Sequence, residues 1–178
     1  NVAPMVIDEI NAGGGLLGRR IELVLQDSAT DDAVAAVKAA KLVQQDKVDV
    51  VLGGIYSSTR QAIKGPVVVQ AKKLYIYPEQ YEGQESDPLI FTGQVAAQQV
   101  EPLIPWLMQQ TDARKFYLPS ADYIWPHVMN QKVREVVTAH GGTITGEEYF
   151  PLDHADYRQT IEKIMASGTD VVYNTTVP

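Results

Sequence analysis

The sequence alternates between short apolar runs and stretches with helical periodicity. Runs rich in β-branched and aromatic residues occur at 21–27, 48–54, 74–78, 89–93, 115–122, 143–151 and 171–176. Most of them are nearly continuous in apolar character, which is typical of strands covered on both faces. The stretches between them carry apolar residues at helical spacing, for example Val100, Leu103 and Leu107. This alternation predicts an α/β fold, a parallel sheet with helices on both faces.

The first and last elements lack their usual partners. Residues 2–10 have a helical pattern that no strand precedes, and the strand pattern at 171–176 has no helix after it. A right-handed crossover connects two strands, so a helix at the start of the chain needs a strand before it. We therefore expect this chain to be part of a longer protein that supplies an opening strand and a large C-terminal part.

Composition excludes several classes of function. The net charge of −7 argues against a nucleic-acid partner, because binding a row of phosphates requires clustered cations. No apolar stretch approaches the roughly 18 residues of a membrane span, so the chain is not expected to be embedded in a membrane. It has no cysteine, and its three histidines have no helical ligand spacing. We predict no metal site and no cofactor.

Polar and aromatic residues gather directly after three of the predicted strands. The clusters lie at 55–59, 78–83 and 122–126. Ligands of open α/β sheets bind outside the carboxyl ends of the strands. Mixed aromatic and polar side chains are typical of a pocket that packs a small ligand and fixes its orientation. We therefore predict that the three clusters converge on one cleft.

The cluster after the second strand also begins a helix. Ser58 with Gln61 fits a capping box, and the same pattern recurs at Asp156 with Gln159. Ser57 lies before that cap, so its hydroxyl and the free N–H groups of the helix start can hold a ligand oxygen. Structural and ligand-binding roles both remain open for these serines. Arg60 is interpreted as a charged side chain that faces solvent or that binds a partner group at the protein surface.

For residues of the other two clusters, structural and ligand-binding roles likewise remain open. Glu79 either faces solvent or accepts hydrogen bonds from the N–H groups of a ligand, and Gln80 lies beside it. Tyr77, Tyr123 and Trp125 are either core aromatics or pocket walls. A Trp next to a Pro in a strand-to-helix loop is an unusual place to bury an indole, which favours the pocket for Trp125.

Five stretches of the chain resemble the type I periplasmic solute-binding proteins. They are INAGGGLLGRRIELVLQDSATD (10–31), GGIYSSTRQA (53–62), YPEQYEGQE (77–85), SADYIWPHVMNQ (120–131) and YFPLDHADY (149–157). The resemblance runs through nearly the whole chain. It is strongest for the branch of urea and short-chain amide receptors, which includes the amide-sensing regulator of aliphatic amidase operons. The wider superfamily includes branched-chain amino acid receptors.

The resemblance implies two α/β lobes joined by a hinge, with the ligand in the cleft between them. Residues 1–94 are then part of lobe one, without its first strand, and residues 95–178 are part of lobe two, without its C-terminal remainder. The amide-sensing members use the positions of Ser57, Tyr77, Tyr123 and Trp125 in their pocket. Ile55, Glu79 and Gln80 depart from the amide sensor and resemble the urea receptors more.

The expected function is that of a non-enzymatic receptor of an ABC importer. It closes around urea, a short-chain amide or a small amino acid, that is, a small neutral or zwitterionic solute, and presents it to a permease. Such a receptor is exported to the periplasm. The alternative is a cytoplasmic amide-sensing regulator that releases a partner protein when its ligand binds. An enzyme is disfavoured because no nucleophile is paired with a base. The predicted ligand-binding residues are Ser57, Ser58, Tyr77, Glu79, Gln80, Tyr123 and Trp125.

Overall fold

The computed structural model describes residues 2–83 and 89–177 as alternating helices and strands. The helices are α1 (Val2–Ala12), α2 (Asp32–Gln44), α3 (Ser57–Lys64), the π-helical η1 (Gly65–Gln70), α4 (Ala96–Thr111), α5 (Ile124–Ala139) and α6 (Arg158–Ala166). The strands are β1 (Val50–Leu52), β2 (Leu74–Tyr77), β3 (Leu89–Phe91), β4 (Lys115–Ala121), β5 (Thr143–Phe150) and β6 (Val171–Val172). The predicted α/β fold with parallel pairing is confirmed.

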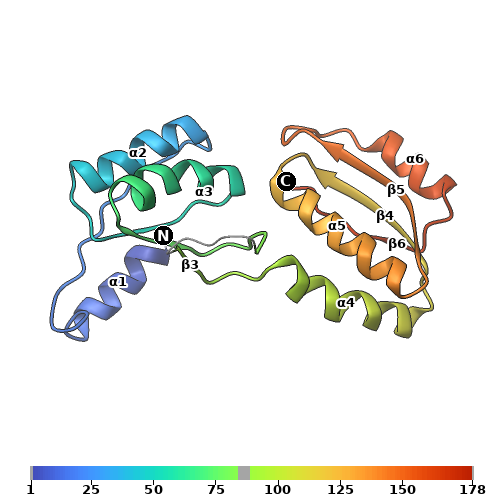
Figure 1. Ribbon diagram of the computed structural model, residues 1–178, viewed down its shortest axis with the longest axis horizontal. Helices are drawn as coiled ribbons and strands as arrows, with labels where there is room; N and C mark the ends of the chain where they lie inside the picture. Colours follow the sequence, from blue (N-terminus) through green and yellow to red (C-terminus); the bar gives the residue numbers. More distant parts are fainter. Residues whose placement is uncertain (1, 84–88, 178) are drawn as a thin grey trace.

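The strands form two separate three-stranded sheets, and every pairing within them is parallel. The strand orders are β1-β2-β3 and β5-β4-β6. Figure 1 shows one sheet in each half of the molecule, with the chain passing from β3 to α4 between them. We call the part from α1 to β3 the first half and the part from α4 to β6 the second half. The exact division at residues 94 and 95 stays a prediction.

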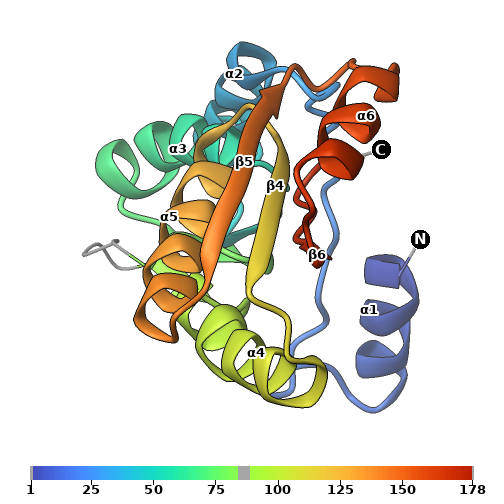
Figure 2. The same ribbon diagram turned by 90° about the vertical axis from the view of Figure 1, so that its right-hand side faces the viewer.

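Helices cover both sheets. In Figure 1, α2 and α3 lie on one side of the first sheet and α1 lies on the other. Figure 2 shows α5 and α6 on opposite sides of β4 and β5. In the part of the chain that the structure describes, no helix is long and apolar enough to cross a membrane, and no group of three acidic, His or Cys side chains is placed to hold a metal ion.

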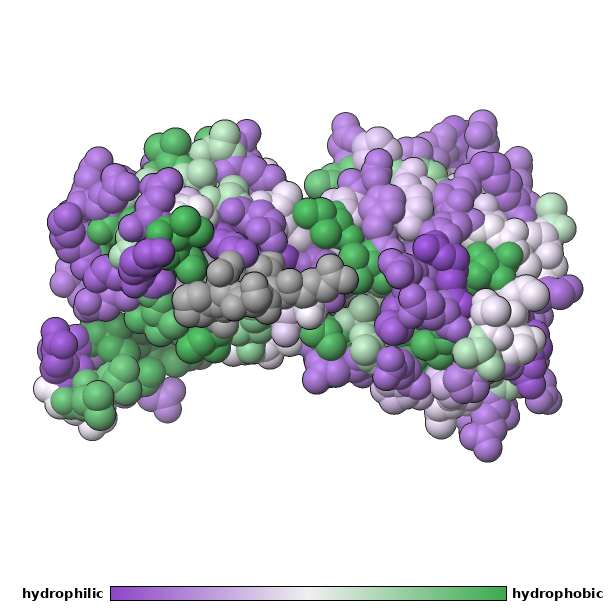
Figure 3. Space-filling model, in the orientation of Figure 1, coloured by the Kyte–Doolittle hydropathy of each residue, from purple (hydrophilic) through white to green (hydrophobic). Residues whose placement is uncertain are grey.

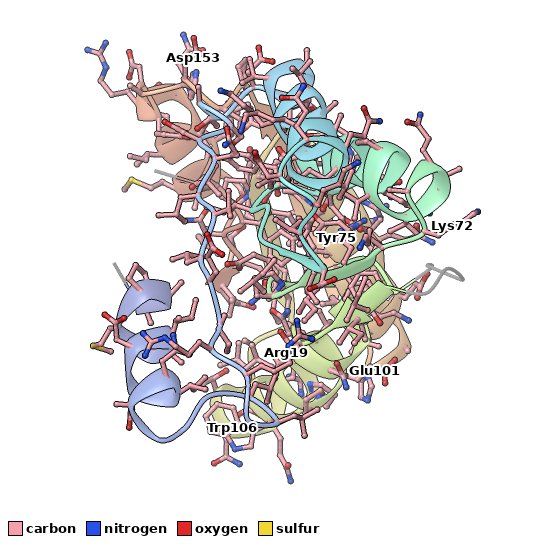
Figure 4. The ribbon with its side chains drawn as sticks, turned by 90° about the vertical axis from the view of Figure 1, so that its left-hand side faces the viewer. Arg19, Lys72, Tyr75, Glu101, Trp106 and Asp153 are labelled. Atoms are coloured by element: carbon pink, nitrogen blue, oxygen red, sulfur yellow. The ribbon has the colours of Figure 1, made fainter. Side chains whose placement is uncertain are left out.

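The core of the first half forms where α2, η1 and the central strand β2 meet. Small residues of α2, Ala35 and Ala39, face this core and allow the helix backbone to approach closely. Tyr75 and Tyr77 of β2 are fully buried within it. Figure 4 shows Tyr75 in this interior, whereas Lys72, just before β2, points outward. The strands are short, with three or four residues each.

The core of the second half is larger and mainly apolar. Val100, Ile104 and Met108 recur every four residues on α4 and pack with the buried faces of α5 and β4. Leu103 of the predicted stripe is instead exposed, because the buried face follows the four-residue spacing. β4 and β5 pair over seven residue positions, and Phe116 of β4 is fully buried.

One buried polar network accompanies this apolar core. The Asn130 side chain of α5 is fully buried and donates to the Ser120 hydroxyl at 2.8 Å and to Glu147 at 3.2 Å. Thr175 also donates to Ser120, at 2.8 Å, and Arg134 binds Glu147 at 2.5 Å. The network therefore ties α5, β4, β5 and the segment after β6 together.

The predicted strand at 21–27 is wrong. This segment has no regular secondary structure, and Leu25 in its middle is exposed. A strand needs a neighbour to satisfy its backbone groups, and none of the described strands lies in a sheet with this segment. Its start is tied to α1 instead: the Asn11 amide binds the backbone of Ile21 at 2.9 and 2.7 Å. The runs at 48–54 and 171–176 do form strands, β1 and β6, but shorter ones.

Both predicted capping boxes are also wrong. The cap of α3 is Tyr56, which makes no side-chain capping bond, and Ser58 lies inside the first turn. The cap of α6 is Tyr157, while the Asp156 carboxylate pairs with the Arg158 side chain at 2.5 Å. A nearby guanidinium satisfies this carboxylate better than a single N–H does, because both partners are charged. Trp125 lies in the first turn of α5 and not in a loop.

Candidate functional site

The segment after β1 and the loop after β2 are joined by a buried carboxylate. Glu82 accepts a hydrogen bond from the Ser57 hydroxyl at one oxygen and from the Arg60 guanidinium, at 2.5 Å, at the other. The Glu82 side chain is 7% exposed and that of Arg60 is 2% exposed. Parallel neighbouring strands end at the same edge of a sheet, which is why residues 22 and 25 positions apart meet here. We call Ser57, Arg60 and Glu82 the carboxylate cluster.

Arg60 lies inside the molecule, so its interpretation as an outward charge is wrong. Its guanidinium is 4.9 Å from the ring centre of Tyr77 and 5.9 Å from that of Phe91. A cation over aromatic faces is attracted to their electron-rich centres, and the carboxylate of Glu82 compensates the buried charge. The first turn of α3 points inward because Ser57, Thr59 and Arg60 are all buried there.

Two tyrosines of β2 support the segment that leads into α3. The Tyr77 hydroxyl donates to the carbonyl oxygen of Ile55 at 2.6 Å, and that of Tyr75 donates to the carbonyl oxygen of Gly53 at 3.0 Å. Burial raises the pKa of Tyr77, and the nearby Arg60 opposes this increase. Gly54 has a φ of +82°, and a Cβ there would lie 2.9 Å from the Tyr75 hydroxyl oxygen. Only glycine allows this close approach.

An aromatic contact joins the two halves next to the carboxylate cluster. The rings of Tyr56 and Tyr123 meet edge to face, with their centres 5.4 Å apart. Desolvation raises the pKa of Tyr123 to about 12, with smaller contributions from Tyr56, Tyr77, Glu82 and Glu79. The segments that follow β1, β2 and β4 therefore lie close enough to interact electrostatically.

The remaining predicted residues lie in different surroundings. Glu79 and Gln80 are exposed, and Ser58 is half-buried. A Cβ at Gly93 would lie 2.0 Å from the carbonyl oxygen of Glu79, so a glycine is needed for the backbone of this loop to pack against residue 93. Trp125 packs against the apolar core of the second half. Its indole N–H is buried and has no acceptor among residues 2–83 and 89–177.

Three residues of this region were not among the predicted ligand-binding residues, although two of them lie within the predicted clusters. They are Tyr56, Arg60 and Glu82. The available signal was a pair of opposite charges, each a few residues past the end of a predicted strand. Such pairs are frequent in any sequence, so the burial that distinguishes this one becomes visible only in the fold. The last two residues of the YPEQYEGQE stretch lie outside the described residues.

The whole chain resembles known binding proteins. Residues 1–177 match the family model described as a periplasmic binding protein domain. One similar solved structure is a solute-binding protein of an ABC transporter from R. palustris in complex with 4-hydroxybenzoate. It has a TM-score of 0.87 and 21% identity, over 98% of this chain and 48% of that chain. Another is the branched-chain amino acid transporter substrate-binding protein LivJ from Streptococcus pneumoniae in complex with isoleucine, with a TM-score of 0.84 and 24% identity over 97% and 49%.

A third similar structure is the leucine-binding protein LivK from Thermotoga maritima, with a TM-score of 0.82 and 18% identity over 94% of this chain and 49% of that chain. The chain thus spans about half the length of each of these three proteins. At these identities the structural similarity establishes the type I binding-protein fold. The family model matches nearly every residue, and the chain therefore belongs to the periplasmic binding protein family.

Proposed function

We propose that this chain forms the ligand-binding part of a solute receptor of an ABC importer. The observation that carries the proposal is the contact of Tyr56 with Tyr123, beside the carboxylate cluster. It brings aromatic faces from both halves next to a buried hydroxyl and a buried carboxylate. This combination is suited to a small polar solute that aromatic rings enclose and hydrogen bonds orient.

The two halves act as lobes that close around the solute. Lobe one comprises residues 1–94 and lobe two residues 95–178. Closure is a hinge movement about the connection from β3 to α4, which Figure 1 shows running between the halves. The closed receptor is the form that a permease recognises, and the periplasm is the compartment where such receptors meet their permease.

The polar groups at this position favour urea, a short-chain amide or a small amino acid. Ser57 provides an oxygen atom for a ligand N–H group, and Glu79 adds a carboxylate at the exposed edge. The Trp125 indole N–H provides a donor for a ligand carbonyl once the ring is free to turn toward it. The similar proteins were solved with isoleucine or 4-hydroxybenzoate, so these two molecules are the alternatives to compare.

A thermal-shift experiment on the full-length protein tests this proposal. Urea, acetamide, glycine, isoleucine and 4-hydroxybenzoate are added separately at increasing concentration. A bound ligand stabilises the folded state by about 2.7 kcal/mol at a hundredfold excess over its dissociation constant, so the melting temperature rises with concentration. We expect this rise with urea, acetamide or glycine. A rise only with 4-hydroxybenzoate, or with none of the five, contradicts the proposal.

A further inference from the structure

We propose that Glu82 is a positioning residue that sets the hydrogen-bond polarity of Ser57, so that the serine oxygen accepts from the ligand and selects a solute that presents an N–H group. This inference rests on the proposed function, since it concerns how the same site chooses its ligand. It separates neutral amides and ureas from carboxylic acids of the same shape.

The first step is the position of the serine proton. Ser57 and Arg60 bind different oxygens of Glu82, and the distance from Arg60 is 2.5 Å. In its ion pair with Arg60, the carboxylate of Glu82 only accepts hydrogen bonds. The hydroxyl group of a serine has one proton and two lone pairs. The hydroxyl proton of Ser57 is therefore donated to Glu82.

The second step is what remains of the serine. With its proton directed at Glu82, the Ser57 oxygen offers only lone pairs to any other group. An amide or urea N–H satisfies them. A carboxylate brings its own lone pairs to the same place, and neither group then has a proton to share. Leaving such a buried polar group without a partner is unfavourable, which produces the discrimination.

A neighbouring hydroxyl, that of Tyr77, also donates its proton to a protein acceptor. Tyr77 donates its proton to the carbonyl oxygen of Ile55. The hydroxyls of Ser57 and Tyr77 thus point their protons at protein acceptors, and neither is available to hold a ligand carboxylate.

The third step is access, since Ser57 is only 1% exposed. Tyr56 precedes it in the chain and touches Tyr123 of the other half. Opening of the two lobes separates these rings and uncovers the start of α3. The ligand reaches the serine in the open state, and the ring pair covers it again when the lobes close.

The matched ligands acetamide and acetate test the polarity directly, because they differ mainly in an N–H group and a charge. Their dissociation constants are measured by titration calorimetry on the full-length protein and on Glu82→Gln. In this variant Arg60 holds the amide oxygen of the new side chain, so its NH₂ group faces Ser57 and releases the serine proton toward the ligand. The wild type is expected to prefer acetamide. The variant is expected to shift the acetamide-to-acetate preference by about tenfold to a hundredfold toward acetate.

Repeating the Glu82→Gln measurement in a Ser57→Ala background distinguishes a positioning role of Glu82 from a general structural effect of the substitution. In Ser57→Ala, the change Glu82→Gln is expected to leave the acetamide-to-acetate preference unchanged, because Glu82 acts through the serine. Glu162→Gln, an exposed carboxylate on α6, is the matched control and is expected to keep the wild-type preference. An equal shift with and without Ser57, or no shift in Glu82→Gln, overturns the inference.

A ligand-free measurement keeps this inference distinct from the proposed function. A serine proton held by Glu82 exchanges slowly with water and gives an NMR hydroxyl signal that disappears in Glu82→Gln. The absence of this signal from the wild type overturns the polarity assignment, whatever the protein binds. If the signal is present but none of the solutes binds, the polarity assignment stands while the proposed function and the ligand selection derived from it fail.

Discussion

The two halves of the molecule share one architecture, three parallel strands with helices, but they differ in strand order and are stabilised by different means. The first half has strands of three or four residues and buries an ion pair, Arg60 with Glu82. The second half pairs strands of seven and eight residues, β4 and β5, and buries an apolar cluster that includes Phe116. Its fully buried amide, Asn130, is neutral.

This difference shows which part of the fold contains buried charges. Charges are placed in the first half beside the start of α3, where they face the other half, and their burial has to be compensated by a partner. The second half has an apolar core that positions Tyr123 from a rigid helix start. The buried ion pair thus lies in the first half, and the larger apolar core lies in the second.

The largest expected effect comes from emptying the core of the second half. Phe116→Ala removes a fully buried ring, and such changes lower the free energy of unfolding by about 3–5 kcal/mol. Urea denaturation of the full-length protein measures this loss. As a control, Trp106→Ala on the exposed face of α4, at the surface in Figure 4, is expected to change stability much less. A loss below about 1 kcal/mol for Phe116→Ala contradicts the assigned role of this core.

Breaking the ion pair of the first half is expected to have the next largest effect. Arg60→Met leaves Glu82 buried without its cation, which lowers the free energy of unfolding by about 3 kcal/mol. The double variant Arg60→Met with Glu82→Leu is expected to recover much of this stability, because no charge is left uncompensated. Denaturation curves of both variants provide the comparison. Equal destabilisation by the single and the double change means that packing, and not charge, determines the role of Arg60.

The smallest expected effect is a loss of stability at acid pH in the second half. Burial raises the pKa of Glu147, but hydrogen bonds from Tyr149, Arg134 and Asn130 outweigh it and hold this pKa below its usual value of 4.5. A carboxyl group with a lowered pKa stabilises the fold above its unfolded pKa, and this contribution is lost as pH falls through the folded value. Melting temperatures between about pH 7 and about pH 3 should therefore fall less steeply for Glu147→Gln than for the wild type. Identical pH dependence of the melting temperature in the two proteins would contradict a contribution of Glu147 to stability at acid pH.

The sequence was a good guide where local pattern decides the structure. β2, β4 and β5 coincide closely with the predicted strands, and in β4 burial on both faces explains the apolar run. The run at 21–27 has the same composition and forms no strand, since strand pairing depends on a neighbour that a local pattern cannot specify. The helix starts at Ser58 and Asp156 were misplaced, and for Asp156 the reason is a competing partner, because its carboxylate pairs with Arg158.

The candidate site was harder to predict than the fold. Its aromatic residues follow strands and could be located, as Tyr77 and Tyr123 show. The direction of a side chain depends on which turn of the helix faces the core. For this reason Arg60 was interpreted as a surface charge, while Glu79 and not Glu82 was named as the candidate ligand-binding carboxylate. The contact between Tyr56 and Tyr123 joins residues that no local pattern relates.

Figure 3 shows a further feature without a counterpart in the predictions, an apolar area over α1, where Val2, Met5 and Val6 are exposed.

The buried pair of Arg60 and Glu82 also constrains how the protein can change over evolutionary time. A lineage that loses either residue first passes through an intermediate with an uncompensated buried charge, and selection removes most such intermediates. The two positions can therefore be exchanged only together. Glu79 and Gln80, exposed at the same loop, carry no such restriction and can vary one at a time. Related receptors are expected to diversify at these two positions while they inherit Arg60 and Glu82 as a unit.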